Sequence, residues 1–396
     1  MPPNTAAAPR VTALDALRGL VMIVMTLDHV RDFFHAGASQ FQPDDLRHTT
    51  VTLFFTRWIT HLCAPVFMFA AGGAAYMRRF NYRSSPAELS PYLWKRGLWL
   101  VFLELTVLRF ALTFHPLDGP ILLTVLWALG WSMVALGFLS RLPIRLLAIL
   151  SLAVVVLHNL TDAGALAMSP GGSPLGDFWK IVHQQGVISI GGIVIVVAYP
   201  LVPWIAVMAL GFCCGEVLLM DPARRQQWLL RLGAGLTASF AVIRLINVYG
   251  DPQPWAVQAS PAFTLLSFLR CTKYPPSLDF LLMTLGPAML LLAWFYRIGL
   301  RAANPLVVIG RVPLFYFLGH MLLAHFLTIP IALIRYGRAG FLLNPPSPAN
   351  VYPAGYGYSL GVVYLVWLLV IGLMYPACVW FGRLKARKSS PLLAYL

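Results

Sequence analysis

The stretch Leu14-Asp-Ala-Leu-Arg-Gly-Leu-Val-Met-Ile-Val-Met-Thr-Leu-Asp-His29 places ionisable side chains inside the first long hydrophobic segment of the chain. Charged side chains are costly in a bilayer, so they usually face a protein interior and mark a functional path. Arg18 and His29 are eleven residues apart. Eleven steps of about 100° return a helix to nearly the same face, roughly 16 Å along its axis. We therefore expect one helix face to present these groups at two depths, placed to hold two ends of a long ligand.

The composition of the 396-residue chain is typical of an integral membrane protein. Hydrophobic residues make up 59% of it and charged residues 11%, and the mean hydropathy is +0.74. Apolar stretches of about 20 residues recur throughout, as in polytopic helical membrane proteins. The net charge of +15 falls between these stretches, as expected for basic cytoplasmic loops. The predicted partner is therefore the lipid bilayer, and no nucleic acid is expected.

The hydrophobic pattern predicts one all-α membrane domain spanning residues 1–396. The basic residues are concentrated in alternate connections, so both termini are expected in the cytoplasm. No signal-peptide cleavage site follows the first segment, which is expected to remain as a membrane helix. Residues 187–198 are β-branched and contain glycine, so a strand-like or re-entrant piece is expected there. The ten predicted spans are 13–34, 52–77, 92–114, 120–140, 143–160, 199–220, 227–248, 278–297, 304–331 and 359–382.

His29 is the strongest candidate for chemistry. An imidazole takes or gives a proton near neutral pH. Asp28 precedes it and Asp32 follows within one helical turn, and a nearby carboxylate raises the basicity of a histidine. A lone histidine at a membrane edge is more often inert. Because Arg18 shares its face and Asp15 lies one turn before Arg18, a functional role is favoured.

A second cluster opens the second segment in the sequence Arg57-Trp-Ile-Thr-His61. Residues four apart on an α-helix share a face, so we expect Arg57 and His61 to line the same cavity as His29. The alternative is a cluster that only ties the second segment to the first. The catalytic candidates are His29, Asp28, Asp32 and His61.

Other polar residues are candidates for structural or binding roles. Glu104 is a lone carboxylate in the third segment, and an arginine is its expected partner. His320 and His325 point to different faces, and the five cysteines lack disulfide or metal-ligand spacing, so no metal site is expected. A polar and aromatic rim on the outer side would bind a sugar or simply cap the bundle; its members are His158, Asn159, His183, Lys273 and Tyr274.

Three classes of function remain open: a membrane enzyme, a secondary transporter or exporter using an Arg/His/Asp proton relay, and a scaffold. The common soluble catalytic and nucleotide-binding motifs are absent from the sequence, which still leaves a membrane acyltransferase. Transporters often contain two related halves, whereas the ionisable residues here crowd into the first three segments. A scaffold leaves the intramembrane charges unexplained, so the enzyme is favoured.

Several motifs together resemble a known family. Leu14-Asp-x-x-Arg18-Gly, followed ten residues later by His29, is similar to the first-span pattern of the transmembrane acyltransferase superfamily. With three further motifs, the chain resembles the bacterial branch of this superfamily that is related to heparan-α-glucosaminide N-acetyltransferase. These motifs are Arg57-Trp-Ile-Thr-His61-x-Cys-Ala-Pro-Val-Phe, Tyr199-Pro-Leu-Val-Pro-Trp204 and Lys273-Tyr-Pro-Pro-Ser277.

The resemblance implies transfer of an acetyl or short acyl group from cytoplasmic acetyl-CoA to an extracytoplasmic sugar hydroxyl or amino group. Acetyl-CoA would be a co-substrate, with no permanently bound cofactor, and the chain would lie in a bacterial inner membrane. The acyl-handling histidine would be His29, with His35 and His48 in the following loop as alternatives. The residues expected to bind or organise acyl-CoA would be Arg18, Asp15, Arg57 and Glu104. The sequence leaves open whether the protein forms a homodimer.

Overall fold

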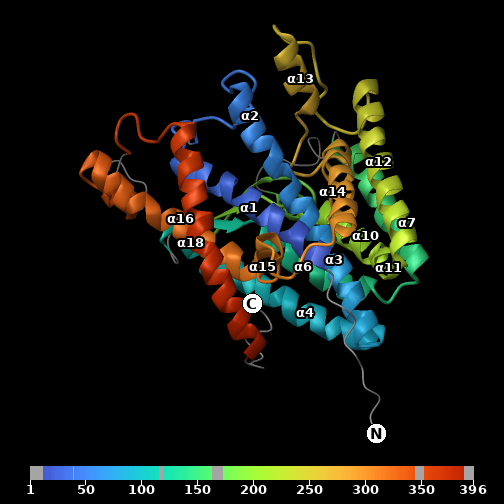
Figure 1. Cartoon of the computed structure of the whole chain (residues 1–396). Helices are drawn as coiled ribbons and strands as arrows, with labels where there is room; N and C mark the ends of the chain where they lie inside the picture. Colours follow the sequence, from blue (N-terminus) through green and yellow to red (C-terminus); the bar gives the residue numbers. More distant parts are fainter. Residues whose placement is uncertain (1–11, 39, 116–118, 163–172, 344–351, 388–396) are drawn as a thin grey trace.

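The computed structural model describes residues 12–38, 40–115, 119–162, 173–343 and 352–387, and helices dominate these ranges (Figure 1). The first half contains α1 (Thr12–Phe34), α2 (Val51–Trp58), a 3₁₀ turn (Ile59–Leu62), α3 (Cys63–Asn81), α4 (Pro86–Leu103), a π-helical turn (Glu104–Leu108), α5 (Arg109–Thr113), β1 (Ile121–Leu123), α6 (Val125–Leu139), α7 (Ile144–Leu157), a second 3₁₀ turn (His158–Thr161), α9 (Pro174–Val182), β2 (Gly186–Ile190) and β3 (Ile193–Val197). The second half contains α10 (Leu201–Cys213), α11 (Gly215–Leu219), α12 (Pro222–Ile246), α13 (Pro261–Leu269), α14 (Leu278–Ile298), α15 (Pro305–Gly310), α16 (Pro313–Tyr336), α17 (Gly340–Leu343) and α18 (Leu360–Arg387).

The membrane character of the fold is confirmed. Within the described residues, seven helical segments are long and apolar enough to cross a membrane. Each of the ten expected segments contains a helix, but α1, α4–α5 and α6 fall outside the seven. The seven segments are Val51–Asn81, Ile144–Thr161, Leu201–Leu219, Pro222–Ile246, Leu278–Ile298, Pro313–Tyr336 and Leu360–Arg387.

Helix α1 lies at the centre of the bundle, where it packs against α3, α14, α15, α16 and α18 (Figure 1). Most of its side chains are buried, including those of Asp15, Asp28 and Arg31. These neighbours keep its charged side chains away from lipid, which is where ionisable groups in membrane proteins are tolerated. The most highly charged helix of the chain can therefore lie inside a membrane bundle.

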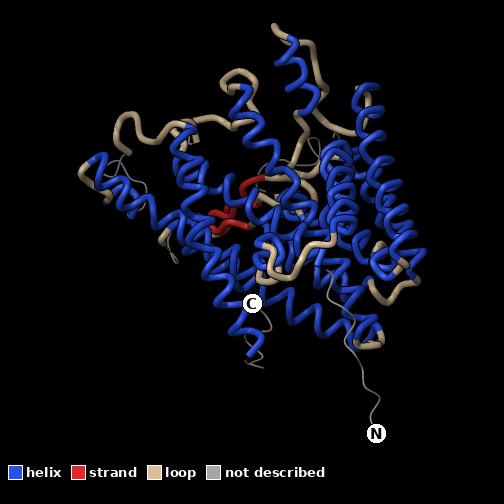
Figure 2. The backbone as a smooth tube through the Cα atoms, in the orientation of Figure 1, coloured by secondary structure: helices blue, strands red, loops and turns tan. Residues whose placement is uncertain are grey.

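The expectation of an all-α fold needs a correction, because a small three-stranded sheet lies among the helices (Figure 2). Strand β3 pairs with β1 in parallel and with β2 in antiparallel register, with Ile195 opposite both Ile121 and Ile188. The strand-like stretch expected at 187–198 is this β2–β3 hairpin. Gly191 and Gly192 both have positive φ, as a two-residue type I′ turn requires.

Several expected spans are interrupted, among them the third and the ninth. The third contains the π-helical turn Glu104–Leu108, and single π turns inside α-helices often mark functional sites. The ninth divides into α15 and α16. Pro313 is the first residue of α16, a position at which a missing amide proton costs no hydrogen bond. Inside one continuous helix the same proline would remove a hydrogen bond and clash with the preceding turn, so the helix is divided here.

Helices α1 and α15 approach so closely that only glycine fits at the crossing. A Cβ atom on Gly310 would lie 1.7 Å from the backbone oxygen of Asp15, and one on Gly19 would lie 1.9 Å from the backbone oxygen of Leu306. Both obstacles are backbone atoms, so no side-chain rotation can relieve the overlap. This contact fixes the depth and rotation of the Arg18 half of α1.

We expect Gly310→Ala to destabilise the folded protein by about 1–3 kcal/mol or more, because the two backbones must separate to admit the methyl group. Gly372→Ala in α18 is the matched control, since nothing lies within 4 Å of a Cβ there. Thermal unfolding of the purified proteins in detergent is the measurement. Equal melting temperatures for the two variants would contradict the close packing of α1 on α15.

Candidate active site

A polar cavity lies beside the His29 end of α1. It has a volume of about 420 Å³, within the usual range for small-molecule sites. Apolar residues of α3, α5 and α16 complete its wall. Segments far apart in the sequence supply its polar lining, which consists of Asp28, His29, Arg31, Asp32, Gln42, Arg57, Thr60, Thr124, Gln185, Tyr199, Lys273 and Tyr274.

A hydrogen bond with His320 determines which ring nitrogen of His29 carries the proton. His29 Nδ1 lies 2.8 Å from His320 Nε2, and His320 Nδ1 lies 2.8 Å from the backbone oxygen of Tyr316. A carbonyl oxygen only accepts, so Nδ1 of His320 donates, and in neutral His320 Nε2 must then be the acceptor. His29 therefore donates from Nδ1 and keeps a lone pair on Nε2. His29 lines the cavity, so this arrangement suits a base.

The sequence reasoning missed His320 as the partner of His29. The two residues lie 291 positions apart, and no local spacing links them. The only signal was a histidine within an apolar segment. His325 faces elsewhere, with its ring stacked against Phe33 and Phe114.

Asp28 is held between two arginines rather than hydrogen-bonded to His29. Arg31 Nη1 lies 2.8 Å from one of its oxygens, and Arg57 donates to the other. Asp32 pairs with Arg31, but its side chain is 55% exposed. The carboxylates expected to orient His29 therefore act through charge, while His320 provides the hydrogen bond that orients its ring.

The expectation that Arg57 and His61 share a face is corrected by the local backbone. Residues 59–62 form a 3₁₀ turn, in which side chains three apart are aligned. Thr60, three residues after Arg57, lines the cavity with it. His61 is absent from the described lining and packs against Phe280, with ring centres 5.3 Å apart.

Arg18 lines a second, more apolar cavity of about 230 Å³, together with Arg96 and Tyr92. Its Nη2 donates to the backbone oxygen of Ala70 at 2.8 Å. The two cavities have four lining residues in common, Met25, Phe67, Val125 and Phe317. Arg18 and His29 therefore lie on two adjoining cavities, in agreement with the arrangement expected from their spacing.

Asp15 has a structural position at the α1–α15 crossing. It is 4% exposed, and its oxygens lie 3.8 Å from the guanidinium groups of Arg18 and Arg311. It is absent from the described lining of either cavity. Asp15 therefore positions Arg18 rather than contacting a ligand in these cavities.

The partner of Glu104 is the start of α6, not an arginine. Its carboxylate accepts hydrogen bonds from the amide and hydroxyl of Thr124 and from the amides of Leu126 and Trp127, at 2.7–3.1 Å. The free amides at a helix N-terminus attract negative charge. Glu104 thus caps α6 and holds Thr124 and Val125 at the polar cavity.

The expected outer rim divides into two groups. Lys273 and Tyr274 line the polar cavity, and the hydroxyl of Tyr274 lies 3.4 Å from that of Tyr199. Burial raises the pKa of Tyr274, but the cations Lys273 and Arg57 and the hydrogen bond with Tyr199 outweigh it and leave the pKa below its usual value. His158, Asn159 and His183 form a separate cluster.

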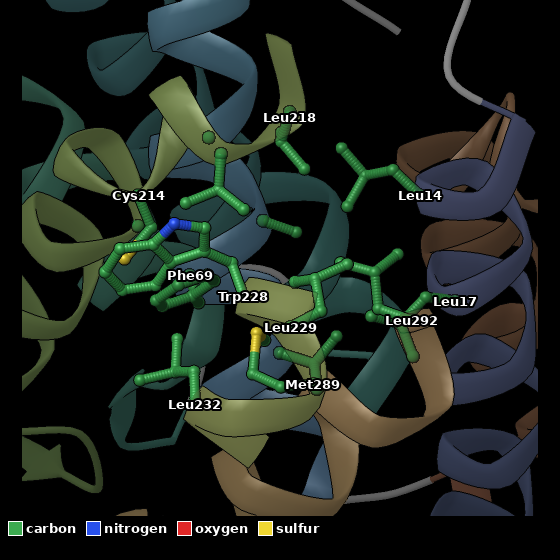
Figure 3. A pocket seen from close by; sticks show the side chains of 15 residues that line it. Leu14, Leu17, Phe69, Cys214, Leu218, Trp228, Leu229, Leu232, Met289 and Leu292 are labelled. Atoms are coloured by element: carbon green, nitrogen blue, oxygen red, sulfur yellow. The ribbon is translucent and has the colours of Figure 1, made fainter. Parts of the chain in front are cut away.

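A third cavity is almost wholly apolar. It lies between α3, α10 and α12, and Figure 3 shows Phe69, Trp228 and Met289 among its lining side chains. Leu14 and Leu17 reach it from α1. Cys214 is the one titratable side chain in its described lining, whereas the polar cavity gathers histidine, carboxylate and cationic groups, so the polar cavity is the candidate active site.

We expect Asp28→Ala to destabilise the protein by about 3–5 kcal/mol, because it leaves two arginines buried without their carboxylate. Asp32→Ala removes an exposed partner of the same Arg31 and should cost no more than about 1 kcal/mol. Membrane abundance and thermal unfolding in detergent compare the two. Similar losses in both variants would show that the buried ion pair does not stabilise the fold.

Residues 10–244, more than half of the chain, match the family described as "Heparan-alpha-glucosaminide N-acetyltransferase, catalytic". This match covers α1, the Arg57 segment and Tyr199, which contribute most of the polar cavity. No curated protein matches the chain. The resemblance of the motifs to this family is confirmed, and the chain belongs to the heparan-α-glucosaminide N-acetyltransferase catalytic-domain family.

Proposed function

We propose that this chain transfers an acetyl or short acyl group from cytoplasmic acyl-CoA to a hydroxyl or amino group, most simply of a sugar, on the other side of a bacterial plasma membrane. The observation that carries the proposal is the pair of adjoining cavities, with arginines in one and the free His29 Nε2 at the other. A long substrate reaching from one cavity into the other would bring its end to a base.

The cavity containing Arg18 and Arg96 suits the CoA end of the donor. Guanidinium groups form charge-assisted, often bidentate, hydrogen bonds with phosphate. The rest of that cavity is lined mainly by leucine, methionine, alanine and phenylalanine, which suits an acyl-pantetheine arm. The thioester would then lie near the shared residues Met25 and Phe317, beside His29.

His29 is proposed as the general base. Its Nε2 takes the proton of the acceptor as the acceptor oxygen or nitrogen attacks the thioester carbonyl. Collapse of the tetrahedral intermediate breaks the carbon–sulfur bond, and the proton passes from His29 to the leaving thiolate of CoA. Throughout, the Nδ1 proton stays on His29 and is held by His320, which keeps the ring in one orientation. Transient acylation of His29 is the alternative route.

The acceptor would occupy the part of the polar cavity nearest Lys273, Tyr274 and Tyr199. These side chains offer an ammonium group and two hydroxyls, which suit the hydroxyl groups of a sugar. Lys273 and Tyr274 come from a connection predicted to face the outside, and Tyr199 begins the predicted span 199–220. The donor and the acceptor would therefore approach from opposite faces and meet at His29.

We expect His29→Ala to lower acetyl-CoA-dependent acceptor acetylation by about 10²–10⁴-fold, the usual contribution of a general base. His35→Ala is the control, because His35 lies just after α1, outside the described lining of both cavities. His320→Gln should retain more activity than His320→Ala, since the amide oxygen can still accept from His29. The assay is release of free CoA by purified protein in liposomes, with abundance matched.

Normal turnover by His29→Ala would overturn the assignment. Solute uptake driven by protons, without acyl-CoA consumption, would instead favour a transporter. Radiolabel retained on denatured wild-type protein but not on His29→Ala would favour the acyl-histidine route over direct transfer.

The proposal requires a defined orientation, with ten spans and both termini in the cytoplasm. We expect a membrane-impermeant thiol reagent added outside intact cells to label Leu175→Cys in α9 but not Tyr82→Cys after α3. Both side chains are well exposed, at 59% and 69%, so access rather than burial decides the result. Each substitution is made in a background lacking the five native cysteines. Labelling of Tyr82→Cys alone would reverse the side from which acyl-CoA enters.

A further inference from the structure

A second cluster of titratable side chains lies outside the proposed acyl-transfer cavity. His158 opens the 3₁₀ turn after α7, Asp162 follows this turn, and His183 follows α9. One ligand atom from each lies within 4.8 Å of the other two. Two imidazoles and one carboxylate form a donor set that zinc proteins use.

The spacing within the cluster matches a metal site. His183 Nε2 lies 3.1 Å from Asp162 Oδ1. Bonds of about 2.0–2.1 Å from Zn²⁺ to nitrogen or oxygen place two tetrahedral ligands about 3.3 Å apart. Two of the three ligand atoms are therefore already at the separation that a shared ion requires. The third, from His158, lies within 4.8 Å of them and needs a movement of up to about 1.5 Å, which a side-chain rotation can supply.

His158 lacks the partner that a buried imidazole needs. It is 6% exposed, and neither ring nitrogen has a hydrogen-bond partner among the described residues. The backbone of Pro276 approaches the ring without meeting hydrogen-bond geometry. Its ring stands edge-on to that of His183, with centres 5.4 Å apart. A buried polar group left unsatisfied is costly and needs an explanation, and a metal ion between the rings supplies one.

The surroundings prepare the other two ligands. Asn159 Nδ2 donates to Asp162 Oδ2 at 2.8 Å, leaving Oδ1 free to face the cluster. Such outer hydrogen bonds orient metal ligands.

Thr161 indicates which nitrogen of His183 carries the proton. Its hydroxyl donates to the backbone oxygen of His158 at 2.6 Å and lies 2.9 Å from His183 Nε2. Because that hydroxyl proton is already used, its oxygen accepts from Nε2, which therefore carries a proton in the metal-free protein. When an ion binds Nε2, this proton would move to Nδ1, so His183 remains a neutral ligand.

We propose that His158, Asp162 and His183 bind one divalent transition-metal ion, best matched by Zn²⁺, with water in the remaining position. The ion would join the end of α7 to the end of α9. Asn159 already links this region to α14, since its Oδ1 accepts from the amide of Leu278 at 2.9 Å. The site would therefore hold the ends of α7 and α9 in place beside α14 without taking part in acyl transfer.

The test uses the full-length protein in detergent, purified through a tag without histidines and treated with a chelator. Wild type is expected to bind one Zn²⁺ per chain by isothermal titration calorimetry, with a higher melting temperature. Co²⁺ in its place should give the intense visible absorption of a tetrahedral site. His158→Ala and His183→Ala should each weaken binding by at least tenfold.

His48→Ala is the matched control, because His48 forms a similar pair with Asp45, at 2.8 Å, but has no second histidine within it. It should bind Zn²⁺ as wild type does. If the alanine variants do not purify as folded protein, His183→Cys provides a second ligand type, and it should keep one Zn²⁺ per chain with an altered Co²⁺ spectrum. No stoichiometric binding by wild type, or equal binding by His158→Ala, overturns the proposal.

Discussion

The buried ion pair of Asp28 with Arg31 and Arg57 is the constraint on which the candidate site depends. It joins the His29 half of α1 to α2 in an interior where an unpaired charge would be very costly. Because Asp28 precedes His29, the same contact fixes the direction in which His29 points. At the other end of α1, the glycine crossing with α15 fixes its depth. The helix is thereby held at both ends, with Arg18 and His29 between these two contacts.

The position of α1 explains how so polar a helix belongs to a membrane protein. The outer helices of the bundle supply the surface that faces lipid, as the exposed apolar side chains of α7, α12 and α18 show; these include Ile149, Leu245 and Leu365. The charged groups of α1 instead meet one another, backbone oxygens or a cavity. Polar chemistry is thus concentrated on one central helix, and the apolar requirement is met by those around it.

Irregular turns of the backbone position several of the residues that line the polar cavity. The 3₁₀ turn after α2 turns Thr60 rather than His61 toward the cavity. The π-helical turn places the Glu104 carboxylate at the start of α6, which holds Thr124 at the wall. Strand β3 ends just before Tyr199, another lining residue. Regular helix geometry would have predicted different neighbours in each case.

The sequence by itself determined the membrane class, the helical segments, the family and the pairing of Arg18 with His29 on one helix face. These depend on composition, hydrophobic period and local spacing, which a chain carries without its fold. Only the tertiary structure decided that His320 forms a hydrogen bond with His29 and that Glu104 caps α6. It also decided that His158 and His183 form a cluster separate from Lys273 and Tyr274. Those contacts join residues from about 20 to 291 positions apart. They depend on how helices cross, and no short-range pattern in the sequence encodes that.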